Sequence, residues 1–397
     1  MARIIDLTRM LAGPFATQIL GDLGSEIIKV EAERVGDYTR RTPPYYKGYS
    51  AYYFSANRNK KSIIVDLKHP DGRQVILDLV KEADVVVENF RPGVMEKLGL
   101  EYHHLQEANP AIILVSINGF GGQGPMRNKT SFDIVAQAMA GAMALTTNDG
   151  GDPIKPAIPL GDLGGGLYAA LGVVRALLER KITGKGQHLE VSLFDAVLAQ
   201  SAHAGEQALL AGEPSEEPLR LVPNGIFATS DGQLAVAAYT DAGWESLCRA
   251  LDRPGWLEDP CFGSMEERSK AASDIQAIVA SALATHSSAH WLEVFAKGGV
   301  PAVPVSRMAD VFADEDLADR HMTDAIPHEV CGPLRTFGNP IQSEDRPFRD
   351  EILSPPRHGQ HTREVMEEVL SYDPDKVNDL MESKAICDFI PEPAIKG

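Results

Sequence analysis

Short apolar runs alternate with amphipathic segments along the first half of the chain. Strands are predicted where apolar, mostly β-branched residues cluster, over residues 3–8, 25–31, 62–66, 84–88, 111–117 and 187–192. Helical spacing follows several of them, over residues 15–23, 70–83, 133–145, 167–181 and 195–210. Apolar strands that alternate with helices are typical of a parallel sheet covered on both faces. This half therefore predicts a Rossmann-like α/β domain over residues 1–210.

The pattern changes after residue 210. Residues 211–222 are rich in Gly, Pro and Glu and predict a linker. Residues 223–324 predict a smaller α+β domain, which opens with a β-hairpin that turns at Asp231–Gly232. Three helices and a short strand are expected to follow, over residues 244–251, 273–285, 288–297 and 301–305. Residues 325–397 are proline-rich at first, then predict a helix over 362–370 and an acidic tail on the surface.

The composition narrows the class of protein. The 397 residues carry a formal net charge of −18 and are 44% apolar, as expected of a soluble globular protein with a sizeable core. Such a charge disfavours nucleic acid and anionic membranes as partners. No apolar run approaches the roughly 20 residues of a membrane span, and no signal-peptide pattern precedes the first strand, so we expect a cytoplasmic protein. The four cysteines lie far apart, which argues against a zinc site and a disulfide framework.

One carboxylate stands out in the stretch from Pro159 to Ala170. Asp162 lies between glycines, and glycines 164–166 precede the apolar run 167–178, which predicts a well-buried helix. We expect the backbone to turn into the helix at these glycines. Main-chain N–H groups at the positive end of the helix would then be open to a ligand or a developing oxyanion. Asp162 is thereby a candidate catalytic group.

Two other interpretations of this stretch stay open. Aspartate is a favoured helix cap, and most such residues only satisfy the first N–H groups of a helix. The spacing Gly164-x-Gly166-x-x-Ala169, with Glu190 further on, also fits a dinucleotide fingerprint for nicotinamide or flavin. Against it, Pro159 interrupts the strand that the fingerprint needs, and the motif lies far from the N-terminal βαβ unit.

Further candidate contacts lie where predicted strands end, because doubly wound sheets bind ligands at the carboxyl ends of their strands. Four of them follow the strand 84–88, namely Asn89, Phe90, Arg91 and Lys97. Residues 45–61 combine five tyrosines with a basic cluster, which fits either base stacking and phosphate binding or a packed surface loop. Asp133, which begins a predicted helix, is either a cap or a polar group near the site.

Five ordered blocks resemble the class III coenzyme A transferase family, which includes formyl-CoA transferase and carnitine CoA-transferase. The blocks are residues 6–14 (DLTRMLAGP), 23–31 (LGSEIIKVE), 87–93 (VENFRPG), 161–166 (GDLGGG) and 183–187 (TGKGQ). The resemblance implies a large domain completed by the returning C-terminal segment, and an interlocked-ring homodimer. It also implies an acyl-CoA and a small carboxylic acid as substrates. Coenzyme A would be bound as a thioester substrate, with no permanently bound cofactor and no metal.

The resemblance places the family's nucleophile on Asp162. Its carboxylate would attack the donor thioester to give a mixed anhydride, and the released CoA would then form an aspartyl-CoA thioester. Glycine N–H groups at the helix start would hold the oxyanion. The family's CoA contacts correspond to Ala12, Val65, Asp66, Leu67, Lys68, Asn89, Phe90, Arg91 and Lys97.

The implied acyl pocket departs from formyl-CoA transferase at Leu11 and Phe132, where that enzyme has a glutamine and a tyrosine. Apolar side chains at both positions disfavour an oxalate-sized acid. We therefore expect a C4 or C5 dicarboxylate as the acceptor and succinyl-CoA as the donor. Asp133 also falls in this pocket, and Asn224 and Gly225 are the nearest candidates for a flap.

Two alternative functions stay open. The α-methylacyl-CoA racemases are similar to this chain, but they carry a histidine at the position of Phe132 as half of an acid–base pair. A noncatalytic CoA-binding protein would keep the loops and would not need Asp162.

Overall fold

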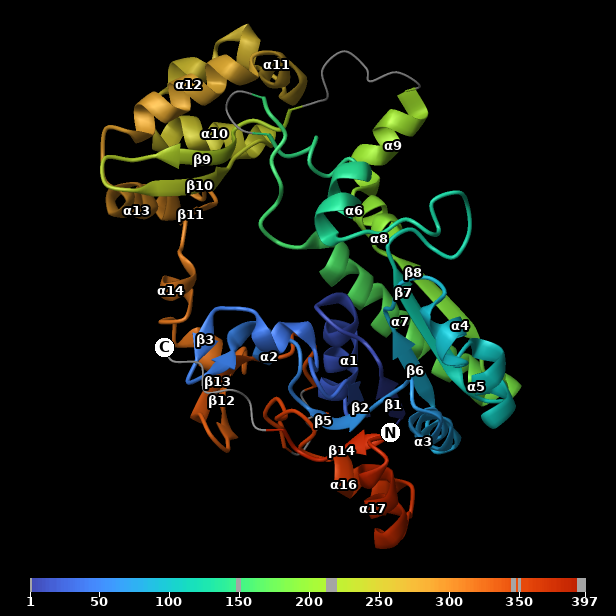
Figure 1. Cartoon of the computed structure of the whole chain (residues 1–397). Coiled ribbons are helices and arrows are strands. Elements are labelled where there is room, and N and C mark those ends of the chain that lie inside the picture. The colour runs from blue at the N-terminus through green and yellow to red at the C-terminus, as the bar shows by residue number, and fades with distance from the viewer. Residues whose placement is uncertain (1, 148–150, 212–219, 344–347, 349–350, 391–397) are drawn as a thin grey trace. The chain divides into compact units, whose positions relative to one another are not determined.

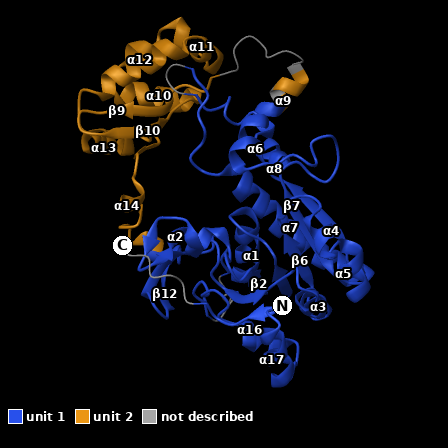
Figure 2. Ribbon diagram, viewed as in Figure 1, with its two compact units in different colours: residues 1–205, 318–397 blue, residues 206–317 orange. Residues whose placement is uncertain are grey.

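The computed structural model describes residues 2–147, 151–211, 220–343, 348 and 351–390. Its contacts divide the chain into two compact units, which Figure 2 shows in different colours. The first unit combines residues 1–205 with 318–397, and the second unit is residues 206–317. The predicted linker, 211–222, falls largely outside the described residues. The second unit is thus inserted between two segments of the first.

A seven-stranded sheet forms the centre of the first unit (Figure 1). Its strands lie in the order β14, β5, β2, β1, β6, β7, β8. Neighbouring strands are parallel except at one edge, where β14 runs antiparallel to β5. The predicted α/β class with a parallel central sheet is therefore confirmed. The bounds are Arg3–Asp6 (β1), Glu26–Glu31 (β2), Lys60–Val65 (β5), Val85–Glu88 (β6), Ile113–Asn118 (β7), His188–Ser192 (β8) and Ile386–Cys387 (β14).

Each face of the sheet carries its own apolar core, because side chains of one strand alternate between the faces. Ile5 and Val86 point to one face, which packs against the first group of helices: α3 (Pro70–Lys81), α4 (Val94–Leu98), α5 (Tyr102–Ala108) and α17 (Pro374–Glu382). Ile4 and Val85 point to the other face, which packs against the second group: α1 (Ala12–Asp22), α6 (Asp133–Met139), α7 (Leu160–Thr183) and α8 (Leu193–Gln200).

The remaining elements of the first unit are short. The N-terminal segment adds η1 (Tyr38–Arg41), β3 (Tyr45–Tyr46), β4 (Tyr49–Ser50) and α2 (Ala51–Ser55). The C-terminal segment adds the hairpin β12 (Thr323–His328) and β13 (Gly332–Phe337), then α16 (Thr362–Glu364) and a π-helical turn (Val365–Val369). Tyr53 and Phe54 of α2 pack on the hairpin residues Ile326 and Leu334, so the two distant segments share one small core.

The second unit holds a three-stranded antiparallel sheet in the order β11, β10, β9. The predicted hairpin is present, with β9 at Asn224–Ala228 and β10 at Gln233–Ala237, and β11 is Ala302–Pro304. Trp244, Trp291 and Phe295 lie in its core. Its helices are α10 (Asp241–Ala250), η2 (Pro254–Leu257), η3 (Pro260–Phe262), α11 (Met265–Lys270), α12 (Ala272–Leu283), α13 (Ser288–Gly298) and α14 (Met308–Val311). Two helices span the division between the units, α9 (Ala202–Ala211) and α15 (Asp316–Asp319).

The C-terminal tail corrects one prediction. Residues after 370 were expected on the surface, but Val377 and Leu380 of α17 are buried against the sheet. β14 then pairs Ile386 with Val65 of β5 and closes that edge. The strand β14 was missed because two residues are too few to give an alternating pattern. The helix α17 was missed because its apolar side is narrow and most of its residues are polar or acidic.

The predicted helix around residues 167–178 also needs correction, because one side of α7 is exposed. Leu167, Leu171 and Ile182 are 54%, 64% and 88% exposed, although we expected a well-buried helix. The buried side of α7 consists of small residues, namely Gly161, Gly164, Gly165, Gly166, Ala169, Ala170, Val173 and Ala176. An apolar run predicts that a helix packs against something, but it does not show whether the partner is the same unit or another molecule. Two other helices are shorter than expected, because α6 ends at Met139 and Ser201 separates α8 from α9.

A buried ionic network lies at the carboxyl end of β1. Asp6 Oδ2 is 3.0 Å from Lys60 Nζ and 4.0 Å from Lys29 Nζ, and Lys29 Nζ is 3.0 Å from Asp37 Oδ2. Burial alone would raise the pKa of Asp6, but the two lysines lower it to about 2. Burial lowers the pKa of Lys60 to about 8. Asp6 Oδ1 also accepts the Thr8 N–H at 2.9 Å, so the network fixes the start of the β1–α1 loop.

Ion pairs account for the basic cluster at residues 58–61, for which the sequence left phosphate binding and packing as alternatives. Arg58 pairs with Asp22, and Lys61 pairs with Glu26 at 3.1 Å. Lys60 is buried with Asp6. The packed interpretation holds for this cluster, because these three cations already have partners.

We expect Asp6→Asn to lower the free energy of unfolding of the first unit by about 3–5 kcal/mol, because two buried lysines lose their shared counter-charge. Urea denaturation followed by far-ultraviolet circular dichroism measures the change. Glu107→Ala is the control, since an exposed side chain changes the free energy by less than about 0.5 kcal/mol. Equal stability of Asp6→Asn and the wild type would show that the network contributes nothing to folding.

Candidate active site

Asp162 is the third residue of α7, which begins at Leu160 after Pro159. The predicted start after the glycines was wrong. Pro159 precedes the helix without a side-chain cap, and its carbonyl accepts the Leu163 N–H at 2.9 Å. Asp162 does not cap the helix either. Within the described residues, its carboxylate has no hydrogen bond and no ion pair.

Glycines 164–166 lie inside α7, where their N–H groups belong to the helix. They therefore do not form the open oxyanion site that we expected, and the dinucleotide fingerprint is wrong because its glycines precede no helix. Their role is close packing. A Cβ on Gly166 would lie 2.7 Å from the Ala12 oxygen, one on Gly165 would lie 2.8 Å from Leu193 Cδ2, and one on Gly164 would lie 2.1 Å from Gln200 Nε2. The contact at Gly166 is with backbone, so there only glycine lets α7 approach α1 so closely, whereas the contacts at Gly164 and Gly165 are with side-chain ends on α8.

Asp133, the first residue of α6, holds the start of α7. Its Oδ1 accepts the Gly161 N–H at 2.9 Å, and its Oδ2 accepts a hydrogen bond from Gln137 Nε2 at 2.7 Å. Lys155 Nζ lies 3.5 Å from the same Oδ2. Two carboxylates and one ammonium group therefore gather around the first turn of α7.

The environment of Asp162 weakens its acidity. Burial, and then the negative charge of Asp133, raise the pKa of Asp162 to about 6, while Lys155 opposes them. Asp162 is therefore mostly ionised at neutral pH but poorly solvated, which favours a nucleophile. Burial and the charge of Asp162 also raise the pKa of Tyr52 in α2, which places this tyrosine within electrostatic reach of the site.

Helix α1 packs close to α7 near this site. Ala12, the first residue of α1, lies against Gly166, and Leu11 before it is buried. Asn89, after β6, binds the loop at Arg9, because its Oδ1 accepts the Arg9 N–H at 2.9 Å and its Nδ2 donates to the Arg9 oxygen at 2.7 Å. The carboxyl ends of β1 and β6 thus supply neighbouring loops on the side of the sheet where α7 begins.

Residues 2–362 match CoA-transferase family III. The chain belongs to this family. It is 35% identical to succinyl-CoA:glutarate CoA-transferase of Mus musculus over 389 residues, which cover 97% of this chain and 89% of that protein. It is also 35% identical to succinyl-CoA:mesaconate CoA-transferase of Haloarcula hispanica over 388 residues, which cover 92% and 95%. The crystal structure of a CAIB/BAIF family protein from Brucella suis has a TM-score of 0.82 and 32% identity, covering 93% and 98%.

The chain is therefore a CoA-transferase. No helix among the described residues is long and apolar enough to cross a membrane. None of the four cysteines, all within the described ranges, is in a disulfide.

The expected CoA contacts of this CoA-transferase lie mainly on loops after β5 and β6. Val65 ends β5 and is buried, Asp66 accepts the Lys68 N–H at 2.9 Å, and Leu67 is half-buried. Three expected cations are exposed and have no side-chain partner among the described residues: Lys68, Arg91 and Lys97. The Phe90 ring lies 5.2 Å from the guanidinium carbon of Arg9.

The remaining expected pocket residues are exposed or belong to the other unit. Phe132 precedes α6 and is 60% exposed. Asn224 and Gly225 belong to β9 of the second unit. Three residues of the site were missed, namely Arg9, Lys155 and Gln137. Arg9 lies within residues 6–14, one of the segments that resemble the family, whereas nothing in the sequence around Lys155 or Gln137 indicated a site.

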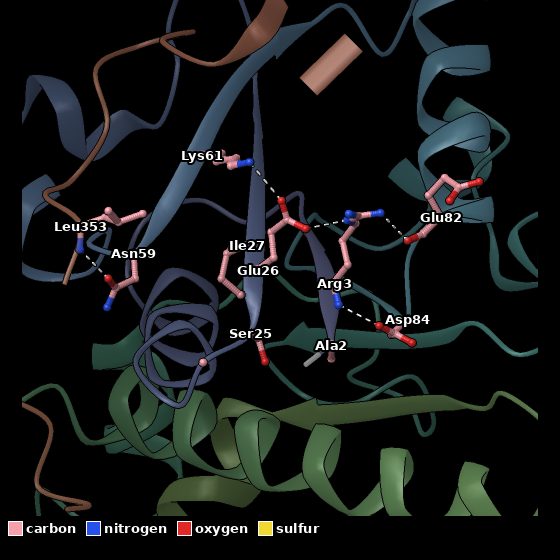
Figure 3. Close-up of a pocket in the computed structure, with 11 residues that line it drawn as sticks. Ala2, Arg3, Ser25, Glu26, Ile27, Asn59, Lys61, Glu82, Asp84 and Leu353 are labelled. Atoms are coloured by element: carbon pink, nitrogen blue, oxygen red, sulfur yellow. Dashed lines mark hydrogen bonds and ion pairs between the residues drawn. The ribbon is translucent and has the colours of Figure 1, made fainter. Parts of the chain in front are cut away.

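A pocket drawn in Figure 3 is a different feature. It lies where β1 and β2 begin, at the opposite end of the strands from Asp162. Most of its charged groups are paired, since Glu26 binds Arg3 at 2.7 Å and Lys61 at 3.1 Å, and Asp84 accepts the Arg3 N–H at 2.7 Å. Glu82 also lines the pocket, and its side chain is exposed.

We expect Asp133→Asn to move the acid limb of the pH–activity profile to lower pH. Attack by Asp162 on an acyl group requires its ionised form, so for a nucleophilic Asp162 we expect wild-type kcat/KM to fall as the pH drops below about 6. Removal of the Asp133 charge lowers the pKa of Asp162, and the relative activity at about pH 5 rises several-fold over that of the wild type. The profile of kcat/KM for CoA transfer measures the shift, with the exposed Asp195→Asn as control. An unmoved acid limb would contradict the assignment.

Proposed function

We propose that this chain transfers coenzyme A from succinyl-CoA to a C4 or C5 dicarboxylic acid, with Asp162 as the nucleophile. The observation that carries the proposal is the Asp162 carboxylate itself, which is largely removed from water and free of partners at the start of α7, with a raised pKa. Similar proteins named for succinyl-CoA and glutarate or mesaconate support the substrate class.

The proposed reaction needs two acyl exchanges on one carboxylate. A carboxylate oxygen of Asp162 attacks the thioester carbon of succinyl-CoA, and the C–S bond breaks to give an aspartyl–succinyl anhydride and CoA thiolate. The thiolate attacks the aspartyl carbon and releases succinate, which leaves an aspartyl-CoA thioester. The acceptor carboxylate then attacks this thioester and the same steps run in reverse. Each step passes one negative charge between carboxylate and thiolate, so no proton is needed.

The same proposal assigns the coenzyme's contacts. Lys68, Arg91 and Lys97 are exposed cations without partners among the described residues, which suits them to the phosphates of CoA. Asn89 ties its loop to the β1–α1 loop at Arg9, and Ala12 at the start of α1 packs against Gly166 of α7. A thioester held along these loops would lead toward Asp162.

Charge supports a dicarboxylate as the acceptor. Leu11 and Phe132 are apolar, but Lys155 lies beside the Asp133–Asp162 pair and its side chain is 42% exposed. A second carboxylate of the substrate would enter a site that already holds two, so it requires a cation. We propose that Lys155 binds the distal carboxylate of the acceptor.

We also propose that the enzyme works as an interlocked homodimer in the cytoplasm. The exposed apolar side of α7, with Leu167, Leu171, Leu178 and Ile182, supports a second copy as its cover. The absence of disulfides among the four cysteines supports the compartment.

We expect Asp162→Asn to reduce CoA transfer by about 10³-fold or more, because an amide cannot form the anhydride. Peptide-mass analysis of the wild type mixed with succinyl-CoA should find a CoA-sized adduct on the Asp162 peptide, and the variant should have none. Asp195→Asn is the matched control, since Asp195 is also the third residue of a helix but exposed. In heavy water, α-deuteration of a branched acyl-CoA without any adduct would instead support a racemase.

We expect Lys155→Met to reduce kcat/KM for glutarate about tenfold relative to kcat/KM for pentanoate, which lacks the distal carboxylate. The ratio is the measured quantity, because loss of Lys155 also raises the pKa of Asp162 and affects both acids alike. Lys185→Met, which changes an exposed lysine after α7, is the control. Equal losses on both acids would rule out recognition of the distal carboxylate by Lys155.

A further inference from the structure

Among the described residues, the guanidinium group of Arg9 has no polar partner and lies near two aromatic rings. Its guanidinium carbon lies 5.2 Å from the centroid of Phe90, after β6, and 6.0 Å from the centroid of Tyr38, the first residue of η1. The side chain is only partly exposed, and no described residue accepts a hydrogen bond from it or forms an ion pair with it. Five N–H donors thus remain for water or a ligand.

Several hydrogen bonds fix the backbone of the loop at Arg9 and Met10. Asn89 bonds both to its N–H at 2.9 Å and to its oxygen at 2.7 Å. The next residue, Met10, has a φ of 69°, a conformation that costs a non-glycine residue free energy, and its N–H binds Asp37 Oδ1 at 3.1 Å. Asp37 is in turn held by Lys29 in the buried network. The loop therefore holds Arg9 in one position before any ligand arrives.

We infer that Arg9 binds a phosphate group of coenzyme A. The inference rests on the proposed function, in which CoA lies along these loops, and it adds a residue to the cations already assigned there. A planar guanidinium can bind two phosphate oxygens at once, which an ammonium group cannot do with the same geometry. The flanking rings exclude part of the water, so that a charge-assisted hydrogen bond there is stronger than on an open surface.

The position of Arg9 favours an anion over other occupants. The protein carries a net charge of −18, so an anionic coenzyme needs local cations. Phe90, which covers one side of Arg9, is followed directly by the exposed and unpaired Arg91. Two guanidinium groups thus come from the loops after β1 and β6, which Asn89 ties together. Both the diphosphate and the 3′-phosphate of CoA offer the required oxygens.

The test compares Arg9→Met with the wild type, using succinyl-CoA, succinyl-3′-dephospho-CoA and succinyl-pantetheine as donors. We expect KM for succinyl-CoA to rise about tenfold to a hundredfold with kcat nearly unchanged, and the kinetics with succinyl-pantetheine to stay as in the wild type. If the 3′-phosphate is the ligand, the dephospho donor is also unaffected by the substitution. If the diphosphate is the ligand, the dephospho donor is affected as strongly as succinyl-CoA.

A purely structural role for the stacked side chain gives a different result. It would impair all three donors alike, or leave all three unchanged, and either outcome overturns the inference. Arg127→Met, which changes an exposed arginine of another loop, is the matched control. Calorimetric titration of the wild type and Arg9→Met with CoA and with pantetheine separates this inference from the proposed function. Loss of CoA affinity alone supports the role of Arg9 even if succinyl-CoA proves not to be the donor.

Discussion

The structure depends on how closely α7 packs against α1. At Gly166 the two backbones approach until a Cβ would lie 2.7 Å from the Ala12 oxygen, a distance that no other residue type tolerates. This contact fixes α7 against α1, and Asp162 lies about one turn before it in the same helix. The glycines that follow Asp162 therefore act through packing. They help to position Asp162, the proposed nucleophile, whereas the proposed chemistry belongs to its carboxylate and the charges around it.

Two aspartates of this unit illustrate how surroundings decide a role. Asp6 and Asp162 are both shielded from water, but Lys29 and Lys60 neutralise Asp6 and lower its pKa to about 2. Asp162 faces another carboxylate, and its pKa rises to about 6. Asp6 is thereby a permanent anion that fixes a loop. The ionised form of Asp162 is destabilised because it is poorly solvated. A bond to an acyl group would remove this charge and so this destabilisation.

Most of the sheet could be predicted from the sequence, because its central strands are buried on both faces and their apolar runs are uninterrupted. β14 could not, since it has two residues and exists only through its pairing with β5. The start of α7 was missed because three glycines and a proline lower helix propensity, which packing against α1 and α8 overrides. Asp162 was singled out by its place between glycines near an expected helix start, and the family resemblance then assigned it the role of nucleophile. Lys155 lies in a segment without regular structure, and only folding brings it to Asp133.

The return of the chain to complete its first sheet has a consequence for synthesis. β5 lies at an edge until β14 pairs with it, and the whole second unit is translated between the two strands. The nascent chain thus carries an open strand edge, with Ile64 and Val65 uncovered, while residues 206–317 emerge. Unpaired apolar edges are where chains associate wrongly. The yield of folded enzyme therefore depends on how long this edge stays open. A chaperone that covers the edge, or rapid folding of the inserted unit, would raise that yield.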